Sequence, residues 1–148
     1  MTVALALHNA NAPGMAGLFS MATRARLVTN WPHAGMVVDG VLMHATLANG
    51  LHATAFTGGS GWDLIELPEQ IAPQVLDAFA RHKGAKYDAV SLLAFLLPWR
   101  VSDSRRMYCY EWCWLAMSGQ NPHWRVTPEQ LLLLAHRINS GGDIRWKT

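Results

Sequence analysis

The sequence predicts an α+β fold in which a small antiparallel sheet has helices before and after it along the chain. Short strand-like runs are separated by Asp39-Gly40 and Asn49-Gly50, and both dipeptides favour two-residue hairpin turns because they tolerate positive φ. In the second half of the chain, apolar residues recur at helical spacing between glycine and proline breakpoints. No repeat, low-complexity segment or linker divides the chain. We therefore expect one domain over residues 1–148, with its core within about 15–138.

The first half of the chain favours strands, because apolar and β-branched residues occur there in short runs between turn residues. The expected strands are residues 2–8, 33–38, 41–47, 51–57 and 62–67. Residues 15–28 interrupt this series with apolar side chains at helical spacing, so a helix is expected between the first two strands.

The second half favours helices, and their ends are marked by glycine, proline or capping residues. Helices are expected over residues 73–83, 88–97, 107–118 and 128–138, and residues 141–148 are expected to be a tail. The last helix has the clearest start. Thr127, Pro128 and Gln130 supply an N-cap, a first-turn proline and the third-position partner of a capping box.

Composition excludes several classes of protein. Hydrophobic residues make up 51% of the chain and charged residues 15%, which excludes a disordered chain and leads us to expect partner chains over some apolar surface. The net charge of +2 comes without a Lys/Arg block, so no nucleic-acid partner is expected. The first twelve residues lack the basic start of a signal peptide, and the longest apolar run is too short to span a bilayer. We expect a soluble protein made in a reducing cytosol, with no membrane span.

Two cysteines do not make a disulfide framework, and they lack the Cys/His spacing of a zinc site. Cys109 and Cys113 are four residues apart on one expected helix, which is a poor geometry for bridging each other. No metal or other cofactor is therefore expected.

The turn at Asp39-Gly40 fixes which side chains share a face of the sheet. If the loop consists of these two residues, Val38 pairs with Val41 and Gly35 lies opposite His44. Counting further, His33 shares the face of His44 as a diagonal neighbour, about 7 Å away at the backbone. Such a pair could be a reactive site, although a histidine on a strand is also a common structural residue.

The same count at Asn49-Gly50 separates a third histidine from this pair. A two-residue loop there pairs Leu47 with His52. Because Leu47 and His44 lie on opposite faces of their strand, His52 is expected on the other face, away from the pair. A three-residue loop would reverse this assignment, because a one-residue slip moves every side chain to the other face.

Cys109 stands where a helix is expected to begin, directly after Arg105 and Arg106. Both the helix dipole and the positive charges favour the thiolate, which is the form that attacks a carbonyl carbon. Cys113 lies one turn deeper, between two tryptophans, where an apolar setting keeps a thiol protonated. We therefore assign the chemical role to Cys109 and a packing role to Cys113.

Two segments carry a resemblance to a known family: His33-Ala34-Gly35-Met36-Val37-Val38 and the later Met43-His44-Ala45. They resemble the His-Val-Gly strand and the following polar strand of NlpC-type papain-like cysteine peptidases. In that family the cysteine usually comes first. Here the histidines precede it, as in the circularly permuted group that includes YiiX-like proteins and relatives of lecithin retinol acyltransferase.

The resemblance implies a catalytic set in which Cys109 is the nucleophile, His33 the base and His44 the residue that orients the base. Gly84-Ala85-Lys86-Tyr87-Asp88 and Tyr108-Cys109-Tyr110-Glu111 are similar to further segments of the permuted group. They imply that Tyr87, Tyr108 and Glu111 line the substrate or the oxyanion. For Glu111, a favourable charge in the first helical turn is an equally good explanation. Tyr110 departs from the family, which usually has a small residue beside the nucleophile.

The layout also resembles small proteins encoded in phage and prophage genomes, some of them associated with tail tips. By analogy, we expect a cell-wall hydrolase that cuts peptidoglycan stem peptides, is incorporated in the virion tail and contacts other tail-tip proteins. Two alternatives remain open. One is a structural tail-tip component with a vestigial site, and the other is a thiol acyltransferase or lipid hydrolase.

Overall fold

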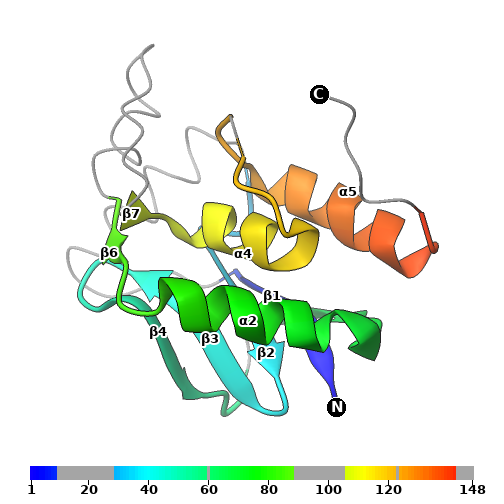
Figure 1. The fold of residues 1–148 in the computed structure, drawn as a ribbon, viewed down its shortest axis with the longest axis horizontal. Coiled ribbons are helices and arrows are strands. Elements are labelled where there is room, and N and C mark those ends of the chain that lie inside the picture. The colour runs from blue at the N-terminus through cyan, green and yellow to red at the C-terminus, as the bar shows by residue number, and fades with distance from the viewer. Residues whose placement is uncertain (10–28, 60, 89–105, 123, 143–148) are drawn as a thin grey trace.

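The computed structural model describes residues 1–9, 29–59, 61–88, 106–122 and 124–142. The helices expected over 15–28 and 88–97, apart from residue 88, and most of the expected tail lie outside the described residues. Within them, the chain is a mixed α+β structure with a five-stranded antiparallel sheet and three α-helices (Figure 1).

The sheet has the strand order β4-β3-β2-β1-β5, and every neighbouring pair is antiparallel. Its strands are β1 Val3–His8, β2 His33–Val38, β3 Val41–Thr46, β4 Gly50–Ala55 and β5 Trp62–Leu67. All five strands were expected from the sequence, and the prediction is confirmed to within two residues at their ends. Two short parallel strands, β6 Lys86–Tyr87 and β7 Arg106–Met107, were not expected.

The helices are α2 Ala72–His82, which follows the 3-10 turn η1 Glu69–Ile71, α4 Cys109–Ser118 and α5 Pro128–Asn139. The expected capping box of α5 is confirmed. The backbone N–H of Gln130 donates to Thr127 Oγ1 at 3.4 Å, and the backbone N–H of Thr127 donates to Gln130 Oε1 at 2.9 Å. Gly119 ends α4 in the left-handed conformation with φ 72°, as the sequence predicts. No helix in the described part of the chain is long and apolar enough to cross a membrane.

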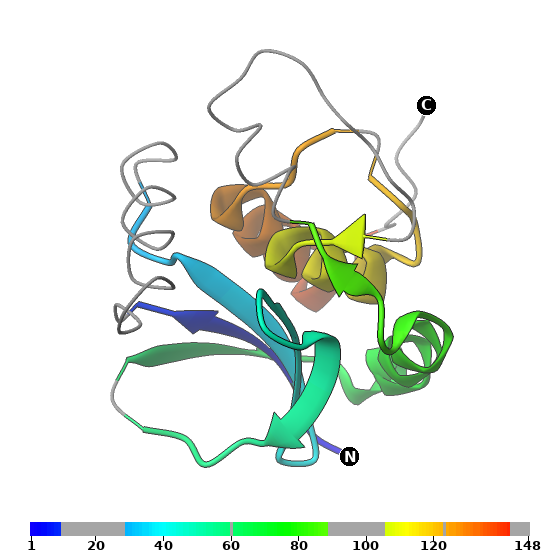
Figure 2. The ribbon, with the colours of Figure 1, turned by 90° about the vertical axis from the view of Figure 1, so that its left-hand side faces the viewer.

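All three helices lie on one face of the sheet, and α4 is the innermost (Figures 1 and 2). Eight of the ten residues of α4 are buried, because the helix packs against β2 and β3 on one side and against α2 and α5 on the others. The core formed in this way includes Leu5, Leu7, Met36, Met43, Trp112, Leu131 and Leu134.

The other face of the sheet is concave and holds a second, smaller apolar cluster. Phe56 follows β4 and Trp62 begins β5, so their strands are the two edges of the sheet. Nevertheless, their ring centroids are 5.7 Å apart. Flat strands about 4.8 Å apart would separate these edges far more widely, so the sheet curls strongly. Ala6, Val37 and Leu42 lie beneath the two rings.

Short contacts also occupy the outer edges of the sheet. On β4, the backbone N–H of Leu51 donates to the carbonyl of Ala85 at 2.9 Å, and the carbonyl of Leu51 accepts the N–H of Gly84 at 2.9 Å. On β5, the side-chain amide of Asn139 donates to the carbonyl of Glu66 at 2.9 Å. These contacts attach β6 and α5 to the two edges.

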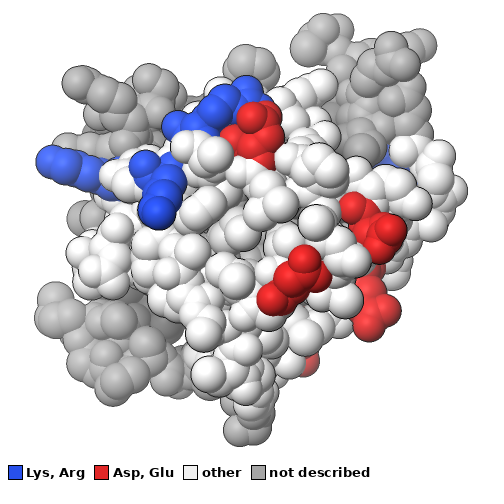
Figure 3. Space-filling view, turned by 60° about the horizontal axis from the view of Figure 1, so that its bottom comes forward, with Lys and Arg blue, Asp and Glu red and all other residues white. Residues whose placement is uncertain are grey.

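Charged side chains are sparse over one broad face of the molecule (Figure 3). Most Lys and Arg side chains lie at the upper left of this view, with one acidic side chain beside them, and most of the other acidic side chains lie toward the right. This distribution follows from the low charged fraction of the sequence. The expectation that partner chains cover apolar surface stays a prediction.

Candidate functional site

The β2–β3 hairpin brings two histidines into contact, as the register count predicts. Asp39 and Gly40 form the two-residue turn with φ 46° and 77°, and Val38 pairs with Val41. His33 Nε2 lies 2.9 Å from His44 Nδ1, and the two rings meet edge to face with centroids 5.1 Å apart.

Gly35 makes room for this contact. A Cβ atom at this position would lie 3.1 Å from His44 Cβ and 2.7 Å from Leu42 Cδ1, which is closer than side-chain atoms normally approach. The absence of a side chain therefore lets β3 and its histidine lie against β2.

His52 was assigned to the wrong face. The β3–β4 loop has three residues, 47–49, and Gly50 follows it with φ 64°. The register is therefore shifted, so that His44 lies directly opposite His52 and Thr46 opposite Gly50. The His44 and His52 rings are 4.6 Å apart between centroids. The extra loop residue moves the His52 side chain to the other face of the sheet. His52 therefore lies beside the His33–His44 pair, whereas the sequence count placed it on the opposite face.

His8 is a further member that the sequence reasoning missed. It pairs with His33 on one side and with Trp62 on the other, and its ring lies 4.5 Å from the Trp62 ring between centroids. Four histidines therefore form a row across one end of the concave face. The residues between β1 and β2 are too many for turn geometry to fix the register, so the sequence holds no local signal for this contact.

Burial keeps the central histidines uncharged at neutral pH. Desolvation, followed by the charges of His44, His8 and His52, lowers the pKa of His33 to about 3. Desolvation and then His52 lower the pKa of His44 to about 4. In the described part of the chain, no three His, Cys, Asp or Glu side chains are placed to hold a metal ion.

Cys109 begins α4 and lies beside the strand that carries His33. The backbone N–H groups of Ala34, the next residue after His33, and of Tyr110 lie close enough to the sulfur to lower the pKa of the thiol. Trp112, one turn further on, donates from Nε1 to the carbonyl of Met43 at 2.9 Å. Met43 pairs with Met36, and this is the β2–β3 pair nearest to the two histidines. The bond from Trp112 therefore attaches α4 to the sheet where β2 and β3 begin to separate.

The expectation that the helix start favours the Cys109 thiolate is wrong in its net effect. The N–H groups of Ala34 and Tyr110 do lower the pKa of the thiol. However, Cys109 is only 2% exposed, and desolvation outweighs these donors, raising its pKa to about 12. Of the two arginines expected to help, Arg105 lies outside the described residues. Cys113 is fully buried, and desolvation raises the pKa of its thiol as expected.

Tyr87 contacts the candidate nucleophile. The parallel pairing of β6 with β7 places Tyr87 opposite Met107, two residues before Cys109. Its hydroxyl lies close enough to the Cys109 sulfur to lower the pKa of the thiol. Desolvation, followed by the charge of Cys109, raises the pKa of Tyr87, so the hydroxyl is a donor at neutral pH. The structure thus brings together Tyr87 and Cys109, which lie in separate sequence segments.

Tyr108 and Glu111 hold the start of α4. The Tyr108 side chain is fully buried, and its hydroxyl accepts the N–H of Val126 at 2.7 Å and donates to the carbonyl of Val126 at 3.3 Å. This hydroxyl joins α4 to the segment before α5, and the role beside the substrate or the oxyanion that the resemblance implies for Tyr108 stays a prediction. The Glu111 carboxylate accepts the backbone N–H of Tyr108 at 3.5 Å, which supports the helix-start explanation. Tyr110 is also buried and donates to the carbonyl of Trp31 at 2.5 Å.

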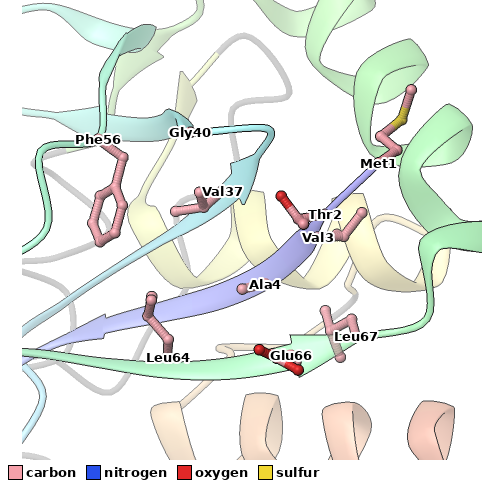
Figure 4. A pocket seen from close by; sticks show the side chains of 10 residues that line it. All are labelled: Met1, Thr2, Val3, Ala4, Val37, Gly40, Phe56, Leu64, Glu66 and Leu67. Carbon is pink, nitrogen blue, oxygen red and sulfur yellow. The ribbon is translucent and has the colours of Figure 1, made fainter.

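An apolar pocket of about 480 Å³ lies on the concave face at the other end of the strands from the histidines (Figure 4). It is lined by Met1, Thr2, Val3, Ala4, Val37, Gly40, Phe56, Leu64, Glu66 and Leu67. Phe56 and its neighbour Trp62 lie between this pocket and the histidine row. The pocket is thus separate from the residues around Cys109.

No family model matches the chain, and no curated protein matches it.

Proposed function

We propose that this chain is a cysteine amidase or endopeptidase with a permuted papain-like arrangement, and that its substrate is the stem peptide of peptidoglycan. The observation that carries the proposal is the position of Cys109 at the start of α4, near enough to the Ala34 N–H on β2 for that donor to lower the pKa of the thiol. His33, the residue before Ala34, is held 2.9 Å from His44, and the proposed reaction requires its ring to reach the sulfur once a peptide is bound. A thiol at a helix start, an imidazole and a third orienting group are the parts of a cysteine hydrolase.

In the resting site, Cys109 is a thiol and His33 is a neutral imidazole, because burial raises one pKa and lowers the other. An imidazole with a pKa of about 3 does not deprotonate a thiol with a pKa of about 12, so His33 acts as the general base only once a bound peptide has changed the surroundings of both groups. The S–H proton moves to His33, the sulfur–carbon bond forms, and the tetrahedral oxyanion collapses to a thioester as the amine leaves with that proton. Water, activated by His33, then hydrolyses the thioester.

The oxyanion would be stabilised by donors that now surround the sulfur. The Tyr110 N–H belongs to the first turn of α4, where backbone donors are free of helical partners. The Tyr87 hydroxyl is a second donor. Because Cys109 is 2% exposed, a peptide has to displace side chains that cover the sulfur.

The test is the release of free amino groups from purified peptidoglycan by the native chain, Cys109→Ala and Cys113→Ala. Both cysteines are buried in the same helix, so the two variants are matched in the side chain they lose. We expect no release with Cys109→Ala and near-native release with Cys113→Ala, while circular dichroism shows both folded. Undiminished release by Cys109→Ala would refute the proposal.

A second candidate is a structural component of a phage tail with a vestigial site. The burial of Cys109 and the raised pKa of its thiol favour this alternative. Under it, the native chain would release no amino groups from peptidoglycan and would instead copurify with tail-tip proteins. The same assay therefore separates the two candidates.

A further inference from the structure

The histidine row contains an unsatisfied atom. His44 Nε2 is buried and has no hydrogen-bond partner among the residues that the structure describes. A buried polar atom without a partner costs roughly 1–3 kcal/mol, so such atoms are usually satisfied by a water or a functional group. The other ring nitrogen of His44 is engaged by His33 Nε2 at 2.9 Å.

The protonation of these rings follows from the proposed reaction, on which this inference rests. If His33 takes the Cys109 proton on Nδ1, that nitrogen is unprotonated at rest and His33 Nε2 carries the hydrogen. His33 Nε2 then donates to His44 Nδ1, which has to be an acceptor. Neutral His44 consequently holds its hydrogen on Nε2, and the unsatisfied atom is a buried donor that lacks an acceptor.

His52 supplies an acceptor beside this donor. Its Nδ1 lies 3.0 Å from the carbonyl oxygen of Gly50, and a carbonyl only accepts, so Nδ1 carries the hydrogen. With that hydrogen on Nδ1, the Nε2 of an uncharged imidazole is an acceptor. Its ring lies opposite His44 in the β3–β4 ladder, with centroids 4.6 Å apart and planes inclined by 39°.

We propose that His52 is a positioning residue of the candidate site, which holds His44 in the Nε2-protonated form through one shared water. The water accepts from His44 Nε2 and donates to His52 Nε2, which satisfies both groups. His44 then keeps Nδ1 free to accept from His33, and His33 keeps Nδ1 free for the thiol proton. His52 acts only through His44 and does not touch the substrate.

The test reads the hydrogen position directly, by long-range proton–nitrogen NMR of ¹⁵N-histidine-labelled protein at pH 7. It compares native protein, His52→Phe, which keeps a ring but no nitrogen, and His52→Gln, which keeps polar atoms. His136→Gln changes an exposed histidine on α5 and is the control. We expect His44 to be protonated on Nε2 in the native, His52→Gln and His136→Gln proteins, and to show mixed forms in His52→Phe.

The kinetic readout is peptidoglycan hydrolysis. We expect His52→Phe to lower kcat on the order of tenfold with KM unchanged, and His52→Gln to recover most of the loss. A native His44 protonated on Nδ1 would overturn the inference, even if no variant folds. So would an unchanged His44 in folded His52→Phe. If the His44 form depends on His52 but Cys109→Ala still hydrolyses, the positioning stands and the proposed function falls.

Discussion

His33 Nε2 lies 2.9 Å from His44 Nδ1, and the contact joins two rings that burial keeps uncharged at neutral pH. The histidines come from adjacent strands whose register is set by the turn between them. Because both rings resist protonation while the chain is folded, the pair links the stability of the fold to pH.

The first prediction concerns acid sensitivity. Folding lowers the pKa of His33 from 6.5 to about 3, so between these values the unfolded chain binds a proton that the folded chain does not. Above pH 6.5, the titration of His33 does not lower the free energy of unfolding. As the pH drops from 6.5 toward 3, the free energy of unfolding falls. The slope is about 1.4 kcal/mol per pH unit for each proton.

Urea unfolding of His33→Gln at a series of pH values from 7 to 4 tests this prediction. The free energy of unfolding of the variant should depend less steeply on pH than that of the native chain, by about 1.4 kcal/mol per pH unit. His136→Gln, at an exposed position on α5, is the control variant. An unchanged slope in His33→Gln would show that another group causes the acid sensitivity.

The second prediction concerns the Cys109 thiol. Because burial raises its pKa to about 12, alkylation by iodoacetamide should be slow at pH 7. Its rate should rise about tenfold per pH unit, without a plateau up to about pH 10. The measurement uses Cys113→Ala, so that Cys109 is the one thiol present. A plateau in the alkylation rate near pH 7 would mean that the donors at the helix start lower the pKa of the thiol more than burial raises it.

The third prediction separates a backbone clash from backbone strain. Gly50 and Gly58 have nearly equal φ values of 64° and 67°. A Cβ atom at Gly50 would lie 2.2 Å from the carbonyl oxygen of Ala85, whereas one at Gly58 would meet nothing within 4 Å. Gly58→Ala should cost about 1–2 kcal/mol of unfolding free energy, which is the left-handed backbone cost.

Gly50→Ala should cost at least about 2 kcal/mol more, because β4 and the segment before β6 have to move apart. Chemical denaturation of both variants measures the difference. Equal losses would show that the approach of Ala85 to Gly50 contributes nothing. Since β6 carries Tyr87, Gly50→Ala should also weaken the contact between Tyr87 and Cys109.

The fourth prediction concerns the attachment of α4 to the sheet. Trp112→Phe removes the donor to the Met43 carbonyl and leaves a buried acceptor and some empty volume. We expect a loss of about 2 kcal/mol or more in unfolding free energy. Trp124→Phe is the comparison, because Trp124 is 38% exposed, and it should cost under about 1 kcal/mol. Similar losses in both would argue against an anchoring role for Trp112.

Local signals in the sequence predicted much of the fold. The five strands and the capping box of α5 depend on turn residues and caps that act over a few positions, and they are found as expected. The His33–His44 contact follows from one two-residue turn, so a count along the chain was sufficient. Such features are fixed by backbone geometry close to the residues concerned.

The rest of the site depends on contacts that no local signal encodes. His52 was misplaced because Asn49-Gly50 lies at the end of a three-residue loop, and the same dipeptide suits either loop length. The protonation state of Cys109 was misjudged because burial is a property of the packed chain, while the helix dipole can be read from the sequence. β6 and β7 have two residues each, too few to show a periodicity.

The two outer edges of the sheet have a consequence for the behaviour of the protein in concentrated solution. A bare edge strand is a template on which a second copy can add its own strand. Here Leu51 on β4 already bonds the segment before β6 through both its N–H and its carbonyl, and the Glu66 carbonyl on β5 is held by Asn139. An incoming strand would have to break these bonds first, so the contacts that bring Tyr87 toward Cys109 also protect the sheet against edge-to-edge aggregation.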